Sequence, residues 1–313
     1  MRKALILAGP TCSGKSALAL GLAKLLGGTV INADSMQVYR ELRILTARPS
    51  PEEETLVPHR LYGVRPAAEP GNAAWWRATA LAEMEACPGL PIICGGTGLY
   101  LSSLTAGIAG IPEPDPACRA EARALLAELG APALHARLAE HDPKTAFALR
   151  PSDGQRIARA WEVWRSTGQG LSVWQTMPAP DSGWRFRAIL LDPPRDALRQ
   201  SIATRFTAML EQGAIAEVQS LLALGLDPAL PAMRAHGVPE LSAYLRGEIL
   251  LSEAQRRACL ATGQYTKRQA TWFHNRPWID KTALHTIHAR VAGLEQFSES
   301  ETGVLLNFIQ DRG

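Results

Sequence analysis

The sequence lacks every common cysteine pattern. Five cysteines are scattered through its 313 residues, and none belongs to a C-x-x-C pair or to a Cys/His spacing suited to zinc. An odd, scattered set of thiols is typical of a reducing compartment. The sequence therefore predicts neither a disulfide framework nor a structural zinc site, and we expect a cytoplasmic protein.

Long hydrophobic runs are also missing. No stretch approaches the roughly 18 uncharged residues that a membrane-spanning helix needs. An apolar run follows Arg2 and Lys3, but it breaks at Gly9-Pro10, and Lys15 lies where a signal peptide requires apolar residues. We therefore expect no membrane association.

The chain carries little net charge. Its formal charge is +3, with 20% charged and 46% hydrophobic residues. This composition is that of an ordinary globular protein with enough apolar material for a sizeable core. Any nucleic-acid footprint must come from local clusters of Arg and Lys rather than from the chain as a whole.

One segment of the chain carries a complete phosphate-binding signature. The pattern G-x-x-x-x-G-K-[ST] is matched by Gly9, Pro10, Thr11, Cys12, Ser13, Gly14, Lys15 and Ser16. The apolar run Ala4–Ala8 predicts a buried parallel strand before it, and residues 15–26 predict a helix after it. Such a loop turns its amides toward an anion, and the helix adds its positive N-terminal dipole. We therefore expect residues 9–16 to bind a phosphate or diphosphate, with Lys15 on the terminal phosphate and the Ser16 hydroxyl as a ligand of Mg²⁺.

A second strand is expected over residues 29–33, and Asp34 follows it directly. Because ligands of open parallel α/β sheets lie at the carboxyl ends of the strands, Asp34 is expected on the same edge as the phosphate loop. The alternative is a structural role, in which Asp34 caps the next helix.

A third strand, over residues 90–94, lacks an acidic residue at its end. P-loop ATPases usually place an Asp there to help hold Mg²⁺. This chain has Gly95, Gly96 and Thr97 instead. The segment therefore favours close approach of backbone and one hydroxyl to a ligand over ATP hydrolysis.

The order of segments predicts two parts. A proline-rich break over residues 111–116 precedes an Ala/Leu-rich helical stretch, and a second proline-rich stretch ends near residue 183. We expect residues 1–111 and 184–313 to form an α/β core, a P-loop NTPase-like parallel sheet with a helical C-terminal part. Residues 112–183 are expected to form an inserted helical lobe.

Within this lobe, the residues Ser152 to Gln155 fit a capping box with Ser152 at the cap. In the helix that follows, Arg156 and Arg159 share one face. An arginine pair beside aromatic residues is able to hold nucleic acid. The alternative is a solvated face with the tryptophans in the core, and composition alone does not decide between the two.

Five segments in a fixed order carry a resemblance to a known family. They are Gly9 to Ser16, Asn32 to Tyr39, Gly95 to Tyr100, Asp153 to Val163 and Tyr265 to Phe273. Over about residues 4–277 the chain resembles the bacterial tRNA dimethylallyltransferases. It departs from their pattern at Val238-Pro239, where a Tyr-Arg or Tyr-Lys pair is usual.

The resemblance implies transfer of a dimethylallyl group from dimethylallyl diphosphate to the exocyclic N6 amine of adenine at position 37 of tRNA. It implies Mg²⁺ as cofactor, Asp34 as catalytic base and Thr97 as a residue that orients the reactants. The anticodon stem-loop of tRNA is the implied partner, and we expect a monomer. The implied tRNA-binding residues are Asp34, Ser35, Met36, Gln37, Thr97, Arg119, Gln155, Arg156, Ile157, Ala158 and Arg159.

Three other functions are compatible with parts of the sequence. An adenylate isopentenyltransferase acting on free AMP or ATP would share the loop and the base, but would not need the basic helical lobes. A P-loop small-molecule kinase would need the acidic residue that is missing after Cys94. An RNA-binding protein without activity would have no use for Lys15 and Asp34 on one edge.

Overall fold

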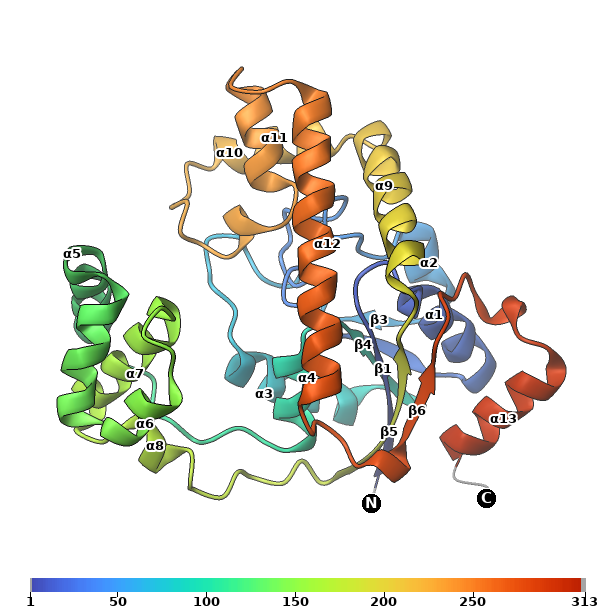
Figure 1. Cartoon of the computed structure of the whole chain (residues 1–313). Coiled ribbons are helices and arrows are strands. Elements are labelled where there is room, and N and C mark those ends of the chain that lie inside the picture. Colours follow the sequence, from blue (N-terminus) through green and yellow to red (C-terminus); the bar gives the residue numbers. More distant parts are fainter. Residues whose placement is uncertain (1, 311–313) are drawn as a thin grey trace. The chain divides into compact units, whose positions relative to one another are not determined.

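A six-stranded parallel sheet organises the computed structural model, which describes residues 2–310 (Figure 1). The strand order is β3-β2-β4-β1-β5-β6, and each neighbouring pair is parallel. The strands are β1 (Arg2–Ala8), β2 (Thr29–Asn32), β3 (His59–Arg60), β4 (Pro91–Gly95), β5 (Trp184–Leu191) and β6 (Leu284–Ile287). The predicted α/β class is confirmed. β6 lies in the C-terminal segment, for which the sequence predicted no element.

The centre of the sheet is buried on both faces. Leu5, Ile6 and Leu7 of β1 have no exposed surface, and neither do Ile92 and Ile93 of β4. This explains why the central strands have continuous apolar runs instead of alternating polar and apolar residues. All strands run the same way, so the carboxyl ends of β1, β2, β4 and β5 share one edge.

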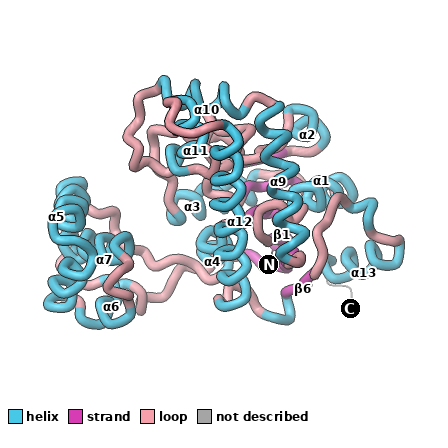
Figure 2. The backbone as a smooth tube through the Cα atoms, turned by 45° about the horizontal axis from the view of Figure 1, so that its top comes forward, coloured by secondary structure: helices cyan, strands magenta, loops and turns pink. Residues whose placement is uncertain are grey.

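Helices cover the sheet and build a second cluster of apolar side chains beyond its edge. The helices of this part are α1 (Lys15–Leu26), α2 (Pro51–Leu56), α3 (Ala73–Ala86), α4 (Gly98–Thr105), α9 (Arg195–Glu211), α10 (Ala214–Ala223), α11 (Val238–Leu245), α12 (Leu251–Asn275) and α13 (Glu299–Gln310), with 3₁₀ turns at Ala232–Arg234, Lys281–Ala283 and Leu294–Gln296. α12 packs against both α9 and α11 (Figures 1 and 2). Together with α10, these helices enclose the loop that follows β2.

The helix predicted after the phosphate loop is confirmed, because α1 spans the expected residues 15–26. The sequence did not predict α4, which begins directly after Thr97, nor did it predict α11 and α13. None of the described helices is long and apolar enough to span a membrane.

Contacts along the chain divide it into two compact units. One contains the residues up to Ala106 and from Ser182 onward, and the other is Gly107–Asp181. The sequence placed these boundaries a few residues later, at 111/112 and 183/184.

The second unit is helical throughout its regular structure. It contains α5 (Pro116–His141), α6 (Pro143–Ala148), α7 (Gly154–Thr167) and α8 (Leu171–Trp174). α5 is interrupted at Gly130, whose φ of 76° and ψ of 166° are not helical. The two parts of α5 and the inner face of α7 enclose an apolar core around Leu134, Leu138 and Trp161.

The predicted cap of α7 was wrong by one residue. The N-cap is Asp153, whose Oδ1 accepts a hydrogen bond from the Arg156 backbone N–H at 3.3 Å. Ser152 lies outside the helix and is exposed. Asp and Ser are about equally favoured at this position, so two adjacent candidates left the sequence without a way to choose.

Candidate diphosphate and acceptor site

The loop between β1 and α1 has the conformation of an anion-binding loop. Gly14 has a φ of 97° and Cys12 a φ of 66°, both in the left-handed region. The Lys15 ammonium donates to the Pro10 carbonyl at 3.3 Å, within the loop. The Ser13 hydroxyl is buried and has no hydrogen-bond partner among the described residues. A closed loop of this kind presents successive amides and the helix N-terminus to an anion.

Asp34 and Lys15 line the same cavity. This cavity has a volume of about 630 Å³, and its walls also include Ser16, Gln37 and Arg205. Asp34 follows β2 and the phosphate loop follows β1, so the parallel sheet brings the two to one edge. The walls of one cavity therefore contain both donors for an anion and a carboxylate.

Asp34 is held by a local turn and does not cap a helix. The Asn32 side-chain oxygen accepts from the Asp34 backbone N–H at 2.8 Å, and Asp34 Oδ1 accepts from Met36 N–H at 2.9 Å. No helix follows, because residues 35–38 form turns. The helix-cap alternative is therefore wrong. Among the described residues nothing donates to Oδ2, which is left able to take a proton.

Thr97 connects the Asp34 turn to the end of β4. Its Oγ1 accepts from the Ser35 backbone N–H at 2.9 Å and donates to the Ser35 hydroxyl at 3.3 Å. Its own N–H donates to the Ala33 carbonyl at 3.2 Å. The glycines before it are required by close packing, because a Cβ on Gly95 would lie 2.1 Å from the Ala33 backbone. The expected hydroxyl is thus part of a rigid contact between two strand ends.

Two site residues were missed from the sequence, and both contact Thr11 of the phosphate loop. Arg205 of α9 donates from Nη2 to Thr11 Oγ1 at 2.7 Å. Gln269 of α12 accepts from the Thr11 N–H at 2.9 Å and donates to the Gly96 carbonyl at 2.8 Å. Gln269 lies in a motif that the resemblance used without assigning it a role. Arg205 had no local signal, since its partner is 194 residues away.

A smaller cavity of about 60 Å³ adjoins Asp34. Most of its lining is apolar and includes Met36, Phe206 and Met209. Tyr265 also faces it, and burial, together with the Asp34 charge, raises the pKa of the Tyr265 phenol far above its usual value. The phenol is therefore neutral under ordinary conditions. A space of this kind suits a small hydrocarbon group next to a carboxylate.

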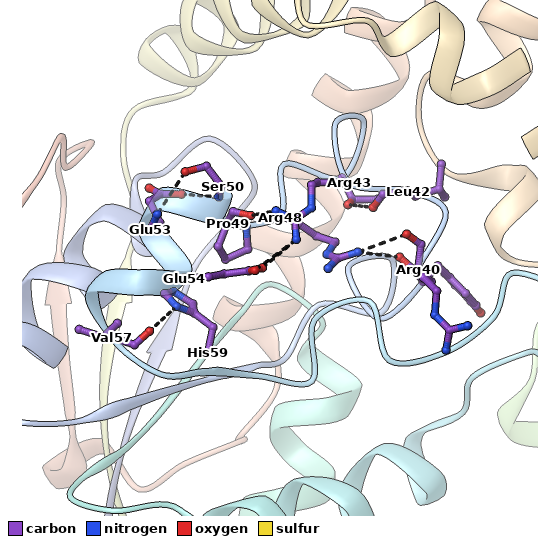
Figure 3. A network of polar contacts seen from close by, with 12 residues as sticks. Arg40, Leu42, Arg43, Arg48, Pro49, Ser50, Glu53, Glu54, Val57 and His59 are labelled. Carbon is purple, nitrogen blue, oxygen red and sulfur yellow. Dashed lines mark hydrogen bonds and ion pairs between the residues drawn. The ribbon is translucent and has the colours of Figure 1, made fainter. Parts of the chain in front are cut away.

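The far wall of the large cavity is a tightly hydrogen-bonded loop, residues 40–54 (Figure 3). The Glu217 carboxylate accepts from the backbone N–H groups of Arg43 and Ile44, each at 2.7 Å. Arg43 donates to Glu54 at 3.0 Å, and the Ser50–Glu53 capping box begins α2. This wall is therefore well ordered before any ligand binds.

The Gln37 side chain is bonded to this wall, and the Arg48 side chain is paired in part, through Nη1 to the carbonyls of Tyr39 and Arg40. The Gln37 amide nitrogen donates to the carbonyls of Thr46 and Ala47, at 2.8 and 2.9 Å. Only the Gln37 amide oxygen therefore remains for a base edge. Burial lowers the pKa of the Arg48 guanidinium, and its Nε has no partner among the described residues.

The arginines expected to bind tRNA lie in ion pairs within the lobe. Arg119 contacts Glu113 at 2.9 Å, Arg156 contacts Asp153 at 3.4 Å, and Arg159 contacts Glu162 at 3.3 Å. Exposed pairs of this kind contribute about 0–1 kcal/mol, so a phosphate is able to replace the carboxylate. Gln155 is exposed, with Arg156, on the outer side of α7.

Ile157 and Ala158 lie in a different environment. Both side chains are buried, and both belong to the apolar core of the lobe. A contact between these two residues and RNA would have to use their backbone, because their side chains pack inside.

The fold and the site define a P-loop protein of a particular kind. A phosphate-binding loop, a carboxylate and a small apolar space share one edge of a parallel sheet, and β4 ends without an acidic residue. This donor set suits a diphosphate attached to a small hydrocarbon.

Comparisons with known proteins identify the family. A family model described as IPP transferase matches residues 37–276, and one described as isopentenyl transferase matches residues 2–70. The chain is 62% identical to a tRNA dimethylallyltransferase of Granulibacter bethesdensis, over 99% of this chain and 98% of the relative. It is 56% identical to one of Gluconobacter oxydans, over 100% and 95%. The chain therefore belongs to the tRNA dimethylallyltransferase family of prenyl-transferring enzymes.

Solved structures agree with this assignment. A full-length tRNA isopentenylpyrophosphate transferase of Bacillus halodurans is 30% identical with a TM-score of 0.69, covering 99% of this chain and 98% of that one. A eukaryotic dimethylallyltransferase acting on tRNA gives a TM-score of 0.84 at 24% identity, covering 100% and 81%. The latter supports the fold alone.

Proposed function

We propose that this protein transfers a dimethylallyl group from dimethylallyl diphosphate to the N6 amine of adenine 37 in tRNA and releases diphosphate. The observation that carries the proposal is that Lys15 and Asp34 line one cavity. One end of this cavity provides donors for a diphosphate. The other end provides a carboxylate beside an apolar space of the right kind for the allyl group.

The phosphate loop would stabilise the leaving group. The bond between the allylic C1 and the diphosphate oxygen breaks, and negative charge accumulates on the diphosphate. The amides of Cys12 and of residues 14–16, which are not used by the Thr11–Gln269 and Ser13–Pro10 hydrogen bonds, and the Lys15 ammonium are preorganised donors for that charge. Arg205, held on Thr11, would add a second cation.

The donor set at this end also fits Mg²⁺. The Ser16 hydroxyl lines the cavity, and such a hard oxygen atom together with a diphosphate is a typical Mg²⁺ ligand set. No cluster of three or more His, Cys, Asp or Glu able to hold a metal is present in residues 2–310, so most ligands would come from the substrate. Bound there, Mg²⁺ would neutralise charge on the diphosphate.

Asp34 would act as the base. As the C1–N6 bond forms, the N6 amine loses one proton, and Oδ2 of Asp34 is able to accept it because Oδ1 is engaged by Met36. An amine conjugated to the purine ring is a weak nucleophile, and general-base assistance typically contributes about 10²- to 10⁴-fold in rate. The adenine would be flipped out of its stack to reach this half-buried carboxylate.

The residues around Asp34 would hold the flipped base. Ser35 and Met36 lie in the same turn, Thr97 fixes that turn, and Gln37 lines the cavity with its amide nitrogen bonded to Thr46. We assign the anticodon stem-loop to Arg119, Gln155, Arg156 and Arg159 of the lobe, with Ile157 and Ala158 acting only through their backbone. We also expect the enzyme to act as a cytoplasmic monomer.

The test compares tRNA and free AMP as acceptors of the dimethylallyl group. Unmodified tRNA is incubated with dimethylallyl diphosphate and Mg²⁺, and the tRNA is digested and weighed by mass spectrometry. We expect adenine 37 to gain one dimethylallyl group, with free AMP unmodified at the same concentration. Modification of AMP but not of tRNA would instead show an adenylate isopentenyltransferase.

The metal is tested in the same assay. Chelation of divalent cations is expected to abolish transfer, and added Mg²⁺ to restore it. Ser16→Ala is expected to raise the Mg²⁺ concentration that restores half of the activity. Full activity in excess chelator would contradict the assignment of Mg²⁺.

A further inference from the structure

The segment after β6 lies directly against the phosphate loop. The Val291 backbone N–H donates to the Ser13 carbonyl at 3.0 Å, and the Val291 side chain is buried. The contact is so close that a Cβ on Gly14 would lie 1.7 Å from the Val291 carbonyl oxygen. In Figure 1 this segment passes beside α1 after leaving β6. The phosphate loop therefore rests on a part of the chain almost 280 residues away.

Both ends of this segment are anchored. His288 Nδ1 lies 3.2 Å from Asp192 Oδ2, just past the end of β5. On the other side, Gln296 accepts from the Ala292 N–H at 2.8 Å and donates to the Arg290 carbonyl at 3.3 Å. With contacts before, at and after Val291, the backbone at Arg290 has little freedom.

Arg290 extends from this anchored backbone to the diphosphate end of the large cavity. It lines the cavity together with Lys15 and Ser16, and its Nε donates to the Ser201 hydroxyl of α9 at 3.0 Å. Among the described residues, nothing accepts from its two terminal nitrogens. By contrast, Arg43 and Arg205 of the same cavity donate to Glu54 and Thr11. A guanidinium fixed through Nε still has its two terminal nitrogens, Nη1 and Nη2, available to donate to a phosphate.

We propose that Arg290 binds the diphosphate of the donor and holds the released diphosphate, which completes the site from the C-terminal segment. The inference rests on the function proposed above for the same cavity. Residues 277–313 lie outside both matched family models, which end at residues 70 and 276. The sequence around Arg290 therefore gave no motif to point to it, and only the fold places it there.

The test uses the full-length enzyme and inorganic diphosphate as probe. Arg290→Ala is compared with Arg290→Lys and with the control Arg199→Ala, an exposed arginine of α9 that does not line this cavity. Charge-assisted hydrogen bonds at a partly exposed site predict a rise of about five- to tenfold in the KM for dimethylallyl diphosphate and in the Kd of diphosphate. In Arg290→Lys, this KM and this Kd are expected to rise less than in Arg290→Ala. The affinity for tRNA is expected to change less than about twofold in either variant.

A second variant keeps the arginine and removes its anchor. Ser201→Ala is expected to raise both constants by about two- to threefold, with an unchanged melting temperature. Unchanged KM and Kd in Arg290→Ala, in a wild-type background that transfers and binds diphosphate, would overturn the inference and leave the proposed function intact. A wild-type enzyme that neither binds diphosphate nor transfers would overturn both.

Discussion

Asp34 shows how a single residue takes its role from its surroundings. Its Oδ1 is used by the turn that fixes it, while no described residue donates to Oδ2, and Asp34 lines the cavity that Lys15 also lines. A structural and a chemical role are thus divided between the two oxygens of one carboxylate. The same residue at the start of a helix would have used its side chain on the helix N–H groups instead.

We expect Asp34→Asn to lower single-turnover transfer by at least about a hundredfold, because the amide keeps the turn but does not accept a proton. Affinity for tRNA should stay within about twofold of the wild type, as measured by filter binding. Asp196→Asn, at an exposed position on α9, is the control and should retain full activity. Near-normal transfer by Asp34→Asn would remove Asp34 from its role as base.

His236 gives a pH-dependent prediction. Burial lowers the pKa of its imidazole below 6.5 and nearby Arg268 adds to this, while Glu240 and Asp34 oppose it. The unfolded chain therefore binds this proton at a higher pH than the folded protein, so the free energy of unfolding falls as pH decreases below about 6.5.

Denaturant unfolding between pH 7.5 and pH 5.5 checks this prediction for His236. The loss of stability is expected to be smaller in His236→Gln, by at most about 1.4 kcal/mol per pH unit, the limit for one proton. His59, whose pKa burial also lowers, should keep its own contribution in this variant. An NMR titration of His236 with a pKa above 6.5 would contradict the expectation.

At the scale of elements, α12 is the helix that joins the two halves of the site. Its 25 residues correspond to about 37 Å of helix. Its buried face contains Thr262, Thr266, Gln269 and Phe273, spaced by three or four residues. Through Gln269 this face connects the phosphate loop to the end of β4.

Gly263 and Gly14 differ in what an added Cβ would meet. Gly263, in the middle of α12, has no neighbour within 4 Å of an added Cβ, so Gly263→Ala should stabilise the protein by about 0.5–1 kcal/mol. Gly14 has a φ of 97°, and a Cβ added there would lie 1.7 Å from the Val291 carbonyl oxygen, so Gly14→Ala should destabilise the protein by more than about 2 kcal/mol.

Denaturant unfolding of the two variants beside the wild type measures both effects. Gly263→Ala should retain transfer activity, because the residue contacts neither the cavity nor the loop. Equal stability of the Gly14 and Gly263 variants would show that Val291 does not support the phosphate loop as described.

At the scale of the whole molecule, the chain presents its cations on two separate units. The sheet unit has Lys15, Arg205 and Arg290 around one cavity, and the helical unit has exposed arginines on α5 and α7. With a net charge of only +3, the position of the cations matters more than their number. Small, localised groups of cations suit one anionic ligand and a short stretch of nucleic-acid backbone.

We expect Arg159→Ala to weaken tRNA binding and to lower the slope of log Kd against log salt concentration by about one, as for the loss of one phosphate contact. Arg246→Ala, an exposed arginine paired with Glu248 in the other unit, is the matched control and should leave the slope unchanged. Binding measured between about 50 and 200 mM salt tests both. A slope that is identical in the two variants would count against Arg159 as a phosphate contact.

The local features of this protein were determined by the sequence. The run Ala4–Ala8, the loop and the helix Lys15–Leu26 are neighbours in the chain, and their pattern predicted a strand, an anion-binding loop and a helix that the structure contains. Asp34 was predicted at the correct edge because parallel strands share their carboxyl ends. The candidate site residues predicted from motifs, Thr97 among them, come from such continuous segments.

The tertiary structure decided what no segment specifies alone. Arg205 and Arg290 line the cavity, and Gln269 contacts the phosphate loop, from helices and a segment that lie about 190 to 280 residues from that loop. Periodicity along the chain tells which face of an element is buried, but not which distant backbone that face meets. The positions of these three residues depend on packing between elements, which is a property of the folded chain.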